Sequence, residues 1–315
     1  MVDIITPSFN IYGHDDIKLP ILLSVPHCGR FYPPEILGQL RISPSALIKL
    51  EDRYVDILAA PSKRAGFPNI MANMARAWID LNRAPDEVDA QMIIGARQGD
   101  FAQPSAKVRG GLGLIPRRMA PWGDIWKGRM TRQDLDNRIE NFHIPYHEKI
   151  TQILGQMKSQ FGSAMLIDLH SMPPILNGGD ALTPYGGDND YNIDDNNVPD
   201  IVIGDIFGST CDNYLTDLVI NHFSQLNYVC RANKKRKLKV AMNAPYAGGY
   251  ILRRHSRPAR GIYAIQIEIG RHLYLDENLF EPITQSSRII GGSIALLITK
   301  LAEIMLGQHI ANAAE

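Results

Sequence analysis

The sequence predicts an α/β domain with a mixed, mostly parallel sheet and helices on both faces. Three apolar runs, at residues 20–26 (PILLSVP), 164–169 (AMLIDL) and 262–267 (IYAIQI), are typical of buried strands. Segments with helical spacing lie between them, and this alternation favours parallel strands covered by helices. Each run leads into a residue that chemistry uses, namely His27, His170 and Glu268. Because ligands bind at the carboxyl ends of strands in open α/β sheets, these residues predict one shared site.

Composition is that of an ordinary globular protein. The chain has 315 residues, of which 45% are hydrophobic and 21% charged, so it can bury a full core, and we expect one domain over residues 1–315. Its formal net charge is zero, which argues against general nucleic-acid binding, since that needs a basic surface. The one basic cluster, at 234–239 (KKRKLK), is interpreted as a solvated hairpin or loop.

Cysteine usage and hydropathy indicate a cytoplasmic protein without a membrane partner. Three cysteines, Cys28, Cys211 and Cys230, cannot form a disulfide framework, which fits a reducing compartment. The N-terminal MVDIITPSFN has an early acidic residue and lacks the apolar core of a signal peptide. No stretch approaches the ~18 uninterrupted apolar residues of a membrane span. Residues 289–304 include two glycines, a serine and a lysine, so we expect a packed helix there.

The first half of the chain contains two predicted helices. Ser43 and Pro44 are typical of an N-cap and a first helical position, and the apolar spacing predicts a helix over 45–65. A short apolar run at 77–81 predicts a strand that leads to Asn82 and Arg83. Residues 97–130 lack a clear period and are expected to form a binding loop or lid. Helical character returns at 131–161, where Pro145 should break or kink the helix.

The second half begins with an unusual acidic segment. Residues 177–197 have too little apolar content to fold alone and are interpreted as an insertion loop. This loop resembles a calcium site in composition, but no glutamate closes a twelve-residue calcium loop. Beyond it we expect strands at 200–207, 238–243 and 262–270, a helix at 213–226 and a C-terminal helix.

Two histidines are candidate metal ligands. Asp168 and His170 should share one face of their strand, so the aspartate can orient the imidazole, as carboxylates do in metal sites. His27 precedes Cys28 and Gly29, a tight turn in which glycine is free to adopt a positive φ. Each histidine alone is better explained by a structural hydrogen bond, whereas the two together raise the case for a shared metal. Cys28 is a weaker candidate nucleophile, because neighbouring side chains point apart.

A catalytic zinc site with two histidines also needs a carboxylate ligand. The acidic pair Glu51 and Asp52 comes nearest in the sequence after His27. A helical wheel places Glu51 in the apolar stripe and Asp52 at its margin, so this pattern favours Glu51. Both carboxylates stay open on the residues alone.

Glu268 is a candidate general acid or base. It leaves an apolar strand on the same face as Gln266, and a partly desolvated carboxyl has a raised pKa, which suits proton transfer. The alternative is a structural ion pair with a neighbour such as Arg271.

Two further segments are candidate substrate contacts. Arg83 at a strand end can bind a carboxylate with two parallel hydrogen bonds, and the alternative is a structural pair with Asp80 or Asp86. The turn at 244–250 (APYAGGY) offers close backbone approach at Gly248 and Gly249. It also carries the phenol of Tyr250, which could donate to an oxyanion or simply pack in the turn.

Seven motifs resemble, in order, those of the N-formylglutamate amidohydrolase family. They are SVPHCG, EDRYVDIL, AWIDLNRAPDE, LIDLHSM, PDIVIGD, NAPYAGGYI and AIQIEIGRHLYLDE, and they extend from about residue 20 to 280. The resemblance implies a fold similar to zinc carboxypeptidases and aspartoacylase, the phosphorylase/hydrolase architecture, with a zinc site at the strand ends.

The resemblance also implies residue roles. It points to His27, Asp52 and His170 as ligands of one zinc ion per chain, and to Asp52 rather than Glu51. Glu268 matches the strand-borne catalytic glutamate. Arg83 matches the residue that holds a substrate carboxylate. The implied reaction is hydrolysis of an N-formyl or N-acyl amino acid, with N-formyl-L-glutamate, a small carboxylate-bearing molecule, as the leading substrate.

The chain departs from the family near the predicted substrate site. Cys28 stands where serine is usual, and Met172, Pro173 and Pro174 stand where a basic residue is usual. Two other functions therefore stay in consideration. One is a same-fold metallohydrolase of another acyl-amino acid, peptide or peptidoglycan fragment, and the other is a non-catalytic carboxylate-binding protein. Two histidines and a carboxylate also fit iron, cobalt or manganese.

Overall fold

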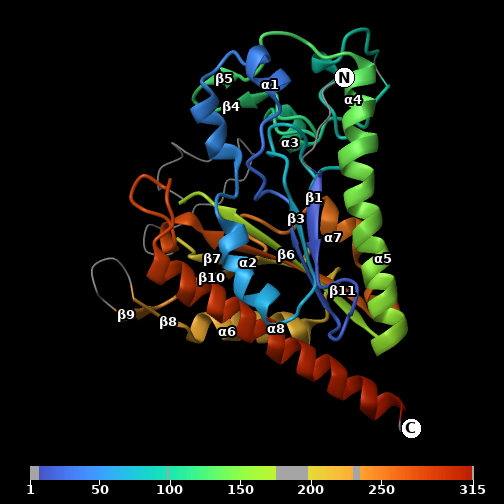
Figure 1. Cartoon of the computed structure of the whole chain (residues 1–315), viewed down its shortest axis with the longest axis vertical. Coiled ribbons are helices and arrows are strands. Elements are labelled where there is room, and N and C mark those ends of the chain that lie inside the picture. Colours follow the sequence, from blue (N-terminus) through green and yellow to red (C-terminus); the bar gives the residue numbers. More distant parts are fainter. Residues whose placement is uncertain (1–6, 98, 175–197, 230–234, 314–315) are drawn as a thin grey trace.

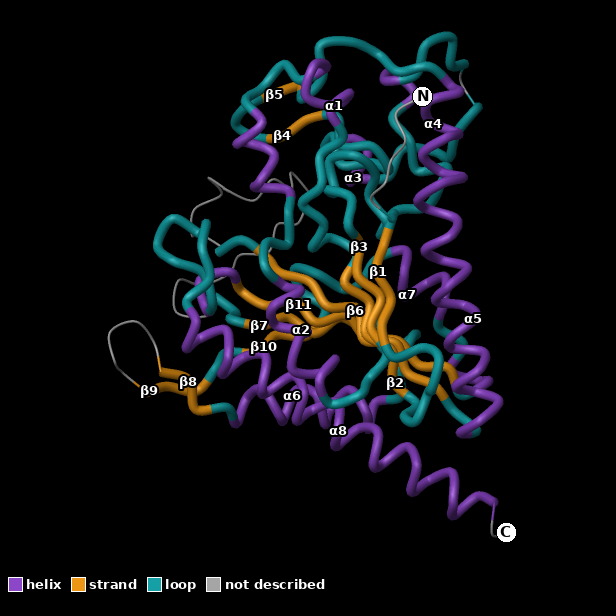
Figure 2. Tube along the Cα trace, in the orientation of Figure 1, coloured by secondary structure: helices purple, strands orange, loops and turns teal. Residues whose placement is uncertain are grey.

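A seven-stranded sheet forms the centre of the protein. The computed structural model describes residues 7–97, 99–174, 198–229 and 235–313, so the acidic segment at 177–197 lies outside the described residues. The strand order is β1-β3-β2-β6-β11-β7-β10, and the sheet crosses the middle of the molecule (Figures 1 and 2). Its strands are β1 (Phe9–Tyr12), β2 (Ile21–Val25), β3 (Asn69–Ala72), β6 (Ala164–Met172), β7 (Ile201–Gly204), β10 (Val240–Met242) and β11 (Ile262–Gly270).

The sheet is mixed and mostly parallel, which confirms the predicted fold class. Strands β3, β2, β6 and β11 run in parallel. Strand β1 is antiparallel to β3, and β7 is antiparallel to β11 but parallel to β10. The register of β6 and β11 pairs Asp168 with Gln266 and His170 with Glu268. The polar residues that end these two strands are therefore direct neighbours.

Helices cover both faces of the sheet. Helix α5 lies along one side, and α2, α6 and α8 lie across the other (Figure 1). The helices are α1 (Pro34–Gln39), α2 (Val55–Arg64), α3 (Ala106–Arg109), α4 (Arg132–Arg138), α5 (Ile144–Phe161), α6 (Asn213–Gln225), α7 (Tyr250–His255) and α8 (Thr284–Ala313).

Strand alternation divides the core into two layers. Leu166 of β6 packs in the layer under α5, whereas Ile167 and Leu169 pack in the layer under α2 and α8. Asp168 lies on the α5 side, because its Oδ1 accepts a hydrogen bond at 2.8 Å from Ser24 Oγ, which also contacts the Tyr146 hydroxyl of α5. The two-residue period of a strand thus directs Asp168 and His170 to one face.

The helix expected over 45–65 is interrupted. A 3₁₀ helix spans Pro44–Leu50 and α2 begins only at Val55, with Tyr54 in the left-handed region at a φ of 61°. The break leaves the N–H of Asp52 free to bond the carbonyl of His27 at 2.9 Å. A continuous helix would use that N–H internally, so the prediction of one helix was wrong at the position that matters for the site.

The prediction of a strand at 77–81 was also wrong. The chain turns there, with the Trp78 N–H bonded to the Ala75 carbonyl at 2.8 Å, and the strand in this region is β3 instead. Ala77, Ile79 and Leu81 are nevertheless buried in the core under α5. Their apolar character reflects burial, which an apolar run alone cannot distinguish from strand pairing.

The two loop predictions are refined by short elements. Between α4 and α5 a π-helical segment spans Ile139–His143, with helical backbone on both sides, and Pro145 lies in the first turn of α5. The helix is therefore distorted next to Pro145 but is not broken. The segment 97–130 contains α3 and a small hairpin of β4 (Arg118–Met119) and β5 (Gly123–Asp124). A second hairpin, β8 (Asn227–Val229) with β9 (Lys235–Lys237), carries much of the basic cluster.

Helix α8 is long and apolar. The most apolar 18-residue window within Thr284–Gly307 has a mean hydropathy of 1.9, so length and composition alone would allow the helix to cross a membrane. Half of its most apolar window is buried within the fold, where it packs against α2 and α6. The helix leaves the body toward its C-terminal end (Figure 1).

Candidate active site

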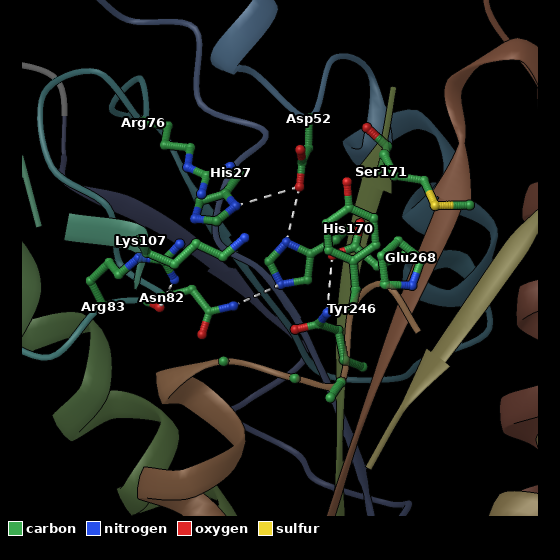
Figure 3. Close-up of a pocket in the computed structure, with 16 residues that line it drawn as sticks. His27, Asp52, Arg76, Asn82, Arg83, Lys107, His170, Ser171, Tyr246 and Glu268 are labelled. Carbon is green, nitrogen blue, oxygen red and sulfur yellow. Dashed lines mark hydrogen bonds and ion pairs between the residues drawn. The ribbon is translucent and has the colours of Figure 1, made fainter. Parts of the chain in front are cut away.

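One cavity collects most of the residues that the sequence singled out. It has a volume of about 130 Å³ and lies where β2, β6 and β11 end (Figure 3). Of the predicted site residues, those that line it are His27, Asp52, Asn82, Arg83, His170, Gly248, Gly249 and Glu268. The residues at the strand ends therefore lie around one cavity, as the strand-end argument expected, and half of the sixteen lining residues are predicted site residues.

His27, Asp52 and His170 form a compact buried cluster. Asp52 Oδ2 lies 2.9 Å from His170 Nδ1 and 3.5 Å from His27 Nδ1. Three potential ligand atoms, one from each residue, all lie within 4.8 Å of one another. Each side chain is at least 96% shielded from solvent.

A second layer of carboxylates orients both imidazoles. Asp80 Oδ1 lies 2.7 Å from Nε2 of His27, and Asp168 Oδ2 lies 2.8 Å from Nε2 of His170. A carboxylate accepts hydrogen bonds, so each Nε2 carries the proton and each Nδ1 turns toward Asp52. Carboxylates orient metal-bound histidines in this way.

Local charges oppose the effect of burial on the pKa values of Asp52, His170 and Asp80. Burial alone would raise the pKa of Asp52, but the hydrogen bond to His170 and the neighbouring His27 outweigh it and set the pKa below its usual range. Burial alone would lower the pKa of His170, yet Asp168 and Asp52 raise it well above its ordinary value. Arg76 and His27 likewise keep the pKa of Asp80 well below the ordinary value despite burial.

These residues fit a divalent metal ion. Nδ1 of His27 is buried and has no hydrogen-bond partner within the described part of the chain. Nδ1 of His170 and Oδ2 of Asp52 lie beside it, so three potential ligand atoms converge there. Two imidazoles and a carboxylate are a common ligand set of catalytic zinc sites.

The neighbouring acid, Glu51, has a different environment. Its carboxylate accepts a hydrogen bond from the Tyr32 hydroxyl at 2.5 Å and pairs with Arg53 at 3.1 Å. Burial raises the pKa of Glu51, but the side chain is absent from the cavity lining. Of the two acids that the sequence left open, Asp52 therefore faces the histidines.

The turn after β2 depends on a glycine. A Cβ on Gly29 would lie 2.0 Å from the carbonyl oxygen of Met74, so no other residue fits there. Gly29 does not adopt the expected positive φ, and close approach to a neighbouring segment explains it instead.

Glu268 lies beside the cluster and faces the cavity. Burial raises the pKa of Glu268 to about 7, and Asp52 adds to the effect while His170 opposes it. Its Oε1 accepts a hydrogen bond from Gln266 at 3.0 Å. The alternative pairing with Arg271 is absent, because that guanidinium contacts Asp52 Oδ1 at 3.3 Å and Ser171 Oγ at 3.1 Å.

Arg83 is fixed by backbone carbonyls rather than by acids. Its Nε donates to Leu112 O at 2.9 Å and its Nη1 donates to Asn82 O at 2.8 Å. The alternative pairs with Asp80 and Asp86 do not form, and Asp80 instead binds Arg76 at 2.8 Å. The guanidinium thus lines the cavity in a fixed orientation, and no carboxylate among the described residues forms an ion pair with it.

Buried histidines support this segment from behind. His147 Nε2 lies 2.9 Å from Leu81 O, and His143 Nε2 lies 2.8 Å from Arg83 O. Burial lowers the pKa of both imidazoles, so they are neutral donors to these carbonyls. The contacts hold the backbone on either side of Asn82.

The glycine turn positions Asn82 as well as the cavity wall. Asn82 Oδ1 accepts from Ile251 N at 2.9 Å, and its Nδ2 lies 3.4 Å from His170 Nε2. A Cβ on Gly249 would lie 2.3 Å from the Asn82 carboxamide. From this turn Pro245, Tyr246 and Ala247 also line the cavity, whereas Tyr250 is not part of the lining. The hydroxyl of Tyr250 accepts a hydrogen bond from Arg254 at 3.0 Å.

Several residues at the site were not predicted as site residues from the sequence. Arg76 and Lys107 line the cavity, and Arg271 braces Asp52 from the side. Asp80 was considered only as a partner for Arg83, although a repeated pattern points to its role. Ile79–Asp80–Leu81 and Ile167–Asp168–Leu169 share the letters IDL, and each aspartate binds one of the two histidines.

Comparisons with known proteins agree with this geometry. The sequence model of the family described as "N-formylglutamate amidohydrolase" matches residues 19–275. The N-formylglutamate deformylase of Pseudomonas putida is 27% identical over 267 residues, which is 85% of each chain. The enzyme of the same name from Pseudomonas aeruginosa is 25% identical over 260 residues, covering 82% of this chain and 84% of its own.

Solved structures extend the likeness to the whole fold. The N-formylglutamate amidohydrolase of Ralstonia eutropha JMP134 aligns with a TM-score of 0.77 and 28% identity over 95% of this chain and 98% of its own. A gene product of Agrobacterium tumefaciens shares the fold, with a TM-score of 0.61 and 16% identity over 98% of this chain and 97% of its own. The family match covers more than half of the sequence, and the chain belongs to the N-formylglutamate amidohydrolase family.

Proposed function

We propose that this protein hydrolyses the formamide bond of N-formylglutamate and releases glutamate and formate. One observation carries the proposal: a buried His–Asp–His cluster, a carboxyl group with a pKa of about 7 and a fixed arginine line a single cavity. The activity named for the two Pseudomonas relatives supports the choice of substrate.

Zinc is the metal that we propose for the cluster. His27 and His170 would hold it through Nδ1, and Asp52 would hold it through Oδ2, the atoms that already face one another. A bound zinc ion supplies Lewis acidity that activates water and the amide carbonyl. The same donors accept cobalt, manganese or iron, so metal analysis decides the identity.

Glu268 is the proposed general base and acid. A group with a pKa of about 7 is matched to proton transfer near neutral pH. Its carboxylate accepts a proton as water adds to the formyl carbon. It then returns this proton to the amide nitrogen as the carbon–nitrogen bond breaks. The substrate nitrogen thereby leaves as an amine, and the formyl group leaves as formate.

Arg83 is the proposed anchor for the α-carboxylate of the substrate. Two backbone carbonyls fix its orientation, so little side-chain entropy is lost when a carboxylate binds. Asn82 and Tyr246 also line the cavity, and we propose them as contacts for the acyl end.

A substrate panel combined with metal analysis tests this function. The purified protein should contain about one zinc per chain and release formate from N-formylglutamate. Removal of the metal with a chelator should abolish turnover, and zinc should restore it. If the protein hydrolyses only N-acetyl amino acids or peptides, one of these is the substrate in place of N-formylglutamate. If the metal-loaded protein binds these compounds but hydrolyses none, the enzymatic function is rejected.

We also propose that the protein works in the cytoplasm. Cys28 and Cys211 are buried free thiols among the described residues. Burial raises the pKa of both thiols, Cys211 to about 12, so neither is a reactive thiolate. Free, inert cysteines fit a reducing compartment.

A further inference from the structure

Lys107 lines the active-site cavity, although it does not lie at the end of a strand of the central sheet. It belongs to α3, a four-residue helix within the long loop region at 97–130. Ser105 caps this helix through the Val108 N–H at 3.2 Å, and Val108 is buried. The Lys107 side chain extends toward the centre of the site, on the side opposite Glu268 (Figure 3). The helix is thus a built support rather than a loose loop.

One residue ties Lys107 to Arg83. The N–H of Leu112 donates to the Lys107 carbonyl at 2.8 Å, and the carbonyl of Leu112 accepts from Arg83 Nε at 2.9 Å. The N–H of Leu112 therefore holds the backbone of Lys107, and its carbonyl holds the guanidinium of Arg83. Their relative position is fixed before any ligand arrives.

Three cationic side chains, those of Arg76, Arg83 and Lys107, line this side of the cavity. Asp80 offsets the charge of Arg76 through a 2.8 Å ion pair, whereas Arg83 has no ion-pair partner among the described residues. The pKa of Lys107 is lowered to about 8, first by burial and then by Arg83 and Arg76, while Glu268 and Asp80 act in the opposite direction. A bound anion would relieve this mutual repulsion.

We propose that Lys107 binds the side-chain carboxylate of the acylated amino acid, so that the site selects acidic substrates. The inference rests on the proposed function and names the group that recognises the second charge. It makes Lys107 a specificity-determining residue, with no part in the bond-breaking step.

The chemistry of the two cations assigns them to different carboxylates. The α-carboxylate lies close to the scissile amide and must be held in one orientation, which suits the planar, fixed guanidinium of Arg83. The side-chain carboxylate is carried on rotatable bonds. The flexible stem and compact charge of Lys107 can follow it.

The test compares N-formylglutamate with N-formylglutamine, its neutral isostere. The wild-type protein should prefer the glutamate substrate. In Lys107→Met, kcat/KM for N-formylglutamate should fall about 10- to 100-fold, the value of a charged hydrogen bond, with KM carrying the loss. The value for N-formylglutamine should change less than about threefold, and Lys107→Arg should recover most of the preference.

Arg109→Met is the matched control. Arg109 lies on the same short helix, is exposed, and donates to the Pro104 carbonyl at 2.7 Å away from the cavity lining. This variant should keep the wild-type preference. Zinc content and melting temperature of all variants establish that the fold and the cluster are intact.

The outcomes separate the two proposals. A wild-type protein that releases formate from neither substrate rejects the proposed function. A wild-type protein that hydrolyses both equally, or a Lys107→Met variant that loses activity equally on both, overturns the role of Lys107 and leaves the deformylase function standing. If Lys107→Met does not fold, the neutral variant Lys107→Gln makes the same comparison, and a retained preference for N-formylglutamate overturns the role of Lys107.

Discussion

Nε2 of His27 lies 2.7 Å from Oδ1 of Asp80, and this contact determines which nitrogen of His27 faces Asp52. The same arrangement recurs between His170 and Asp168 at 2.8 Å. In both pairs the carboxylate is buried. The outer carboxylates thus set the proton positions of the inner cluster.

Asp80→Asn should weaken metal binding. An amide binds the Nε2–H less strongly than a carboxylate and removes a buried charge, and loss of such an outer partner typically costs 10- to 100-fold in metal affinity. Competition with a chelator of known affinity measures the change. Asp86→Asn, an exposed change six residues along, should leave the affinity unaltered, and an equal loss in both variants would contradict the orienting role.

Asp52→Asn should abolish metal binding, whereas Glu51→Gln should leave it intact. Asp52 faces both histidines, whereas Glu51 bonds Tyr32 and Arg53. We expect Asp52→Asn to abolish stoichiometric zinc binding and Glu51→Gln to retain it with reduced thermal stability. Elemental analysis of the two purified variants decides, and full zinc in Asp52→Asn would remove that residue from the ligand set.

Glu268→Gln should separate binding from chemistry. The glutamine is nearly isosteric but cannot accept a proton, so kcat should fall on the order of 10²–10⁴. Zinc content and KM should stay near the wild-type values, because the residue is not a proposed ligand. Steady-state kinetics on N-formylglutamate measure the change, and a kcat within threefold of wild type would eliminate the proposed role.

The pH dependence of KM should report the charge of Lys107. Its pKa of about 8 lies below the ordinary lysine value, so the cation is complete well below pH 8 and is lost as pH rises through that value. The charged groups that act on it are Arg83, Arg76, Glu268 and Asp80. KM for N-formylglutamate should therefore rise above pH 8 while KM for N-formylglutamine changes little, and the difference should vanish in Lys107→Met.

Gly249→Ala should damage the site through Asn82. The added methyl group would lie 2.3 Å from the carboxamide, so Asn82 must move away from His170 and Ile251. Overpacking of this kind costs about 1–3 kcal/mol of stability, and catalytic activity should fall with it. Gly155→Ala in α5 has open space around it and should raise stability by up to ~1 kcal/mol. Thermal unfolding compares the two, and an unchanged Gly249→Ala variant would show that the turn is adaptable.

The residues delivered by strands were predictable from the sequence. His170 and Glu268 follow from apolar runs with a two-residue period, because the carboxyl ends of parallel strands meet at one edge of a sheet. The period also directs Asp168 to the side of His170. These inferences need only local pattern and the general topology of α/β sheets.

Residues placed by irregular backbone were not predictable in the same way. The helical wheel favoured Glu51 because it assumed a continuous helix. The helix is in fact interrupted before Val55, where Tyr54 adopts a left-handed conformation. Lys107 lies on a four-residue helix in a stretch without apolar period, so its arrival at the cavity depends on tertiary contacts made by Val108 and Leu112. No local pattern encodes such contacts.

His170 and Glu268 are paired across β6 and β11, so activity requires the correct register of these two strands. Shifting either strand by one residue would reverse the faces of its side chains and send one of the two into the layer under α8. A partly folded chain with its helices formed but this register unset would lack a working centre. During refolding, formate release should therefore lag behind the recovery of helical structure and appear together with completion of the central strands.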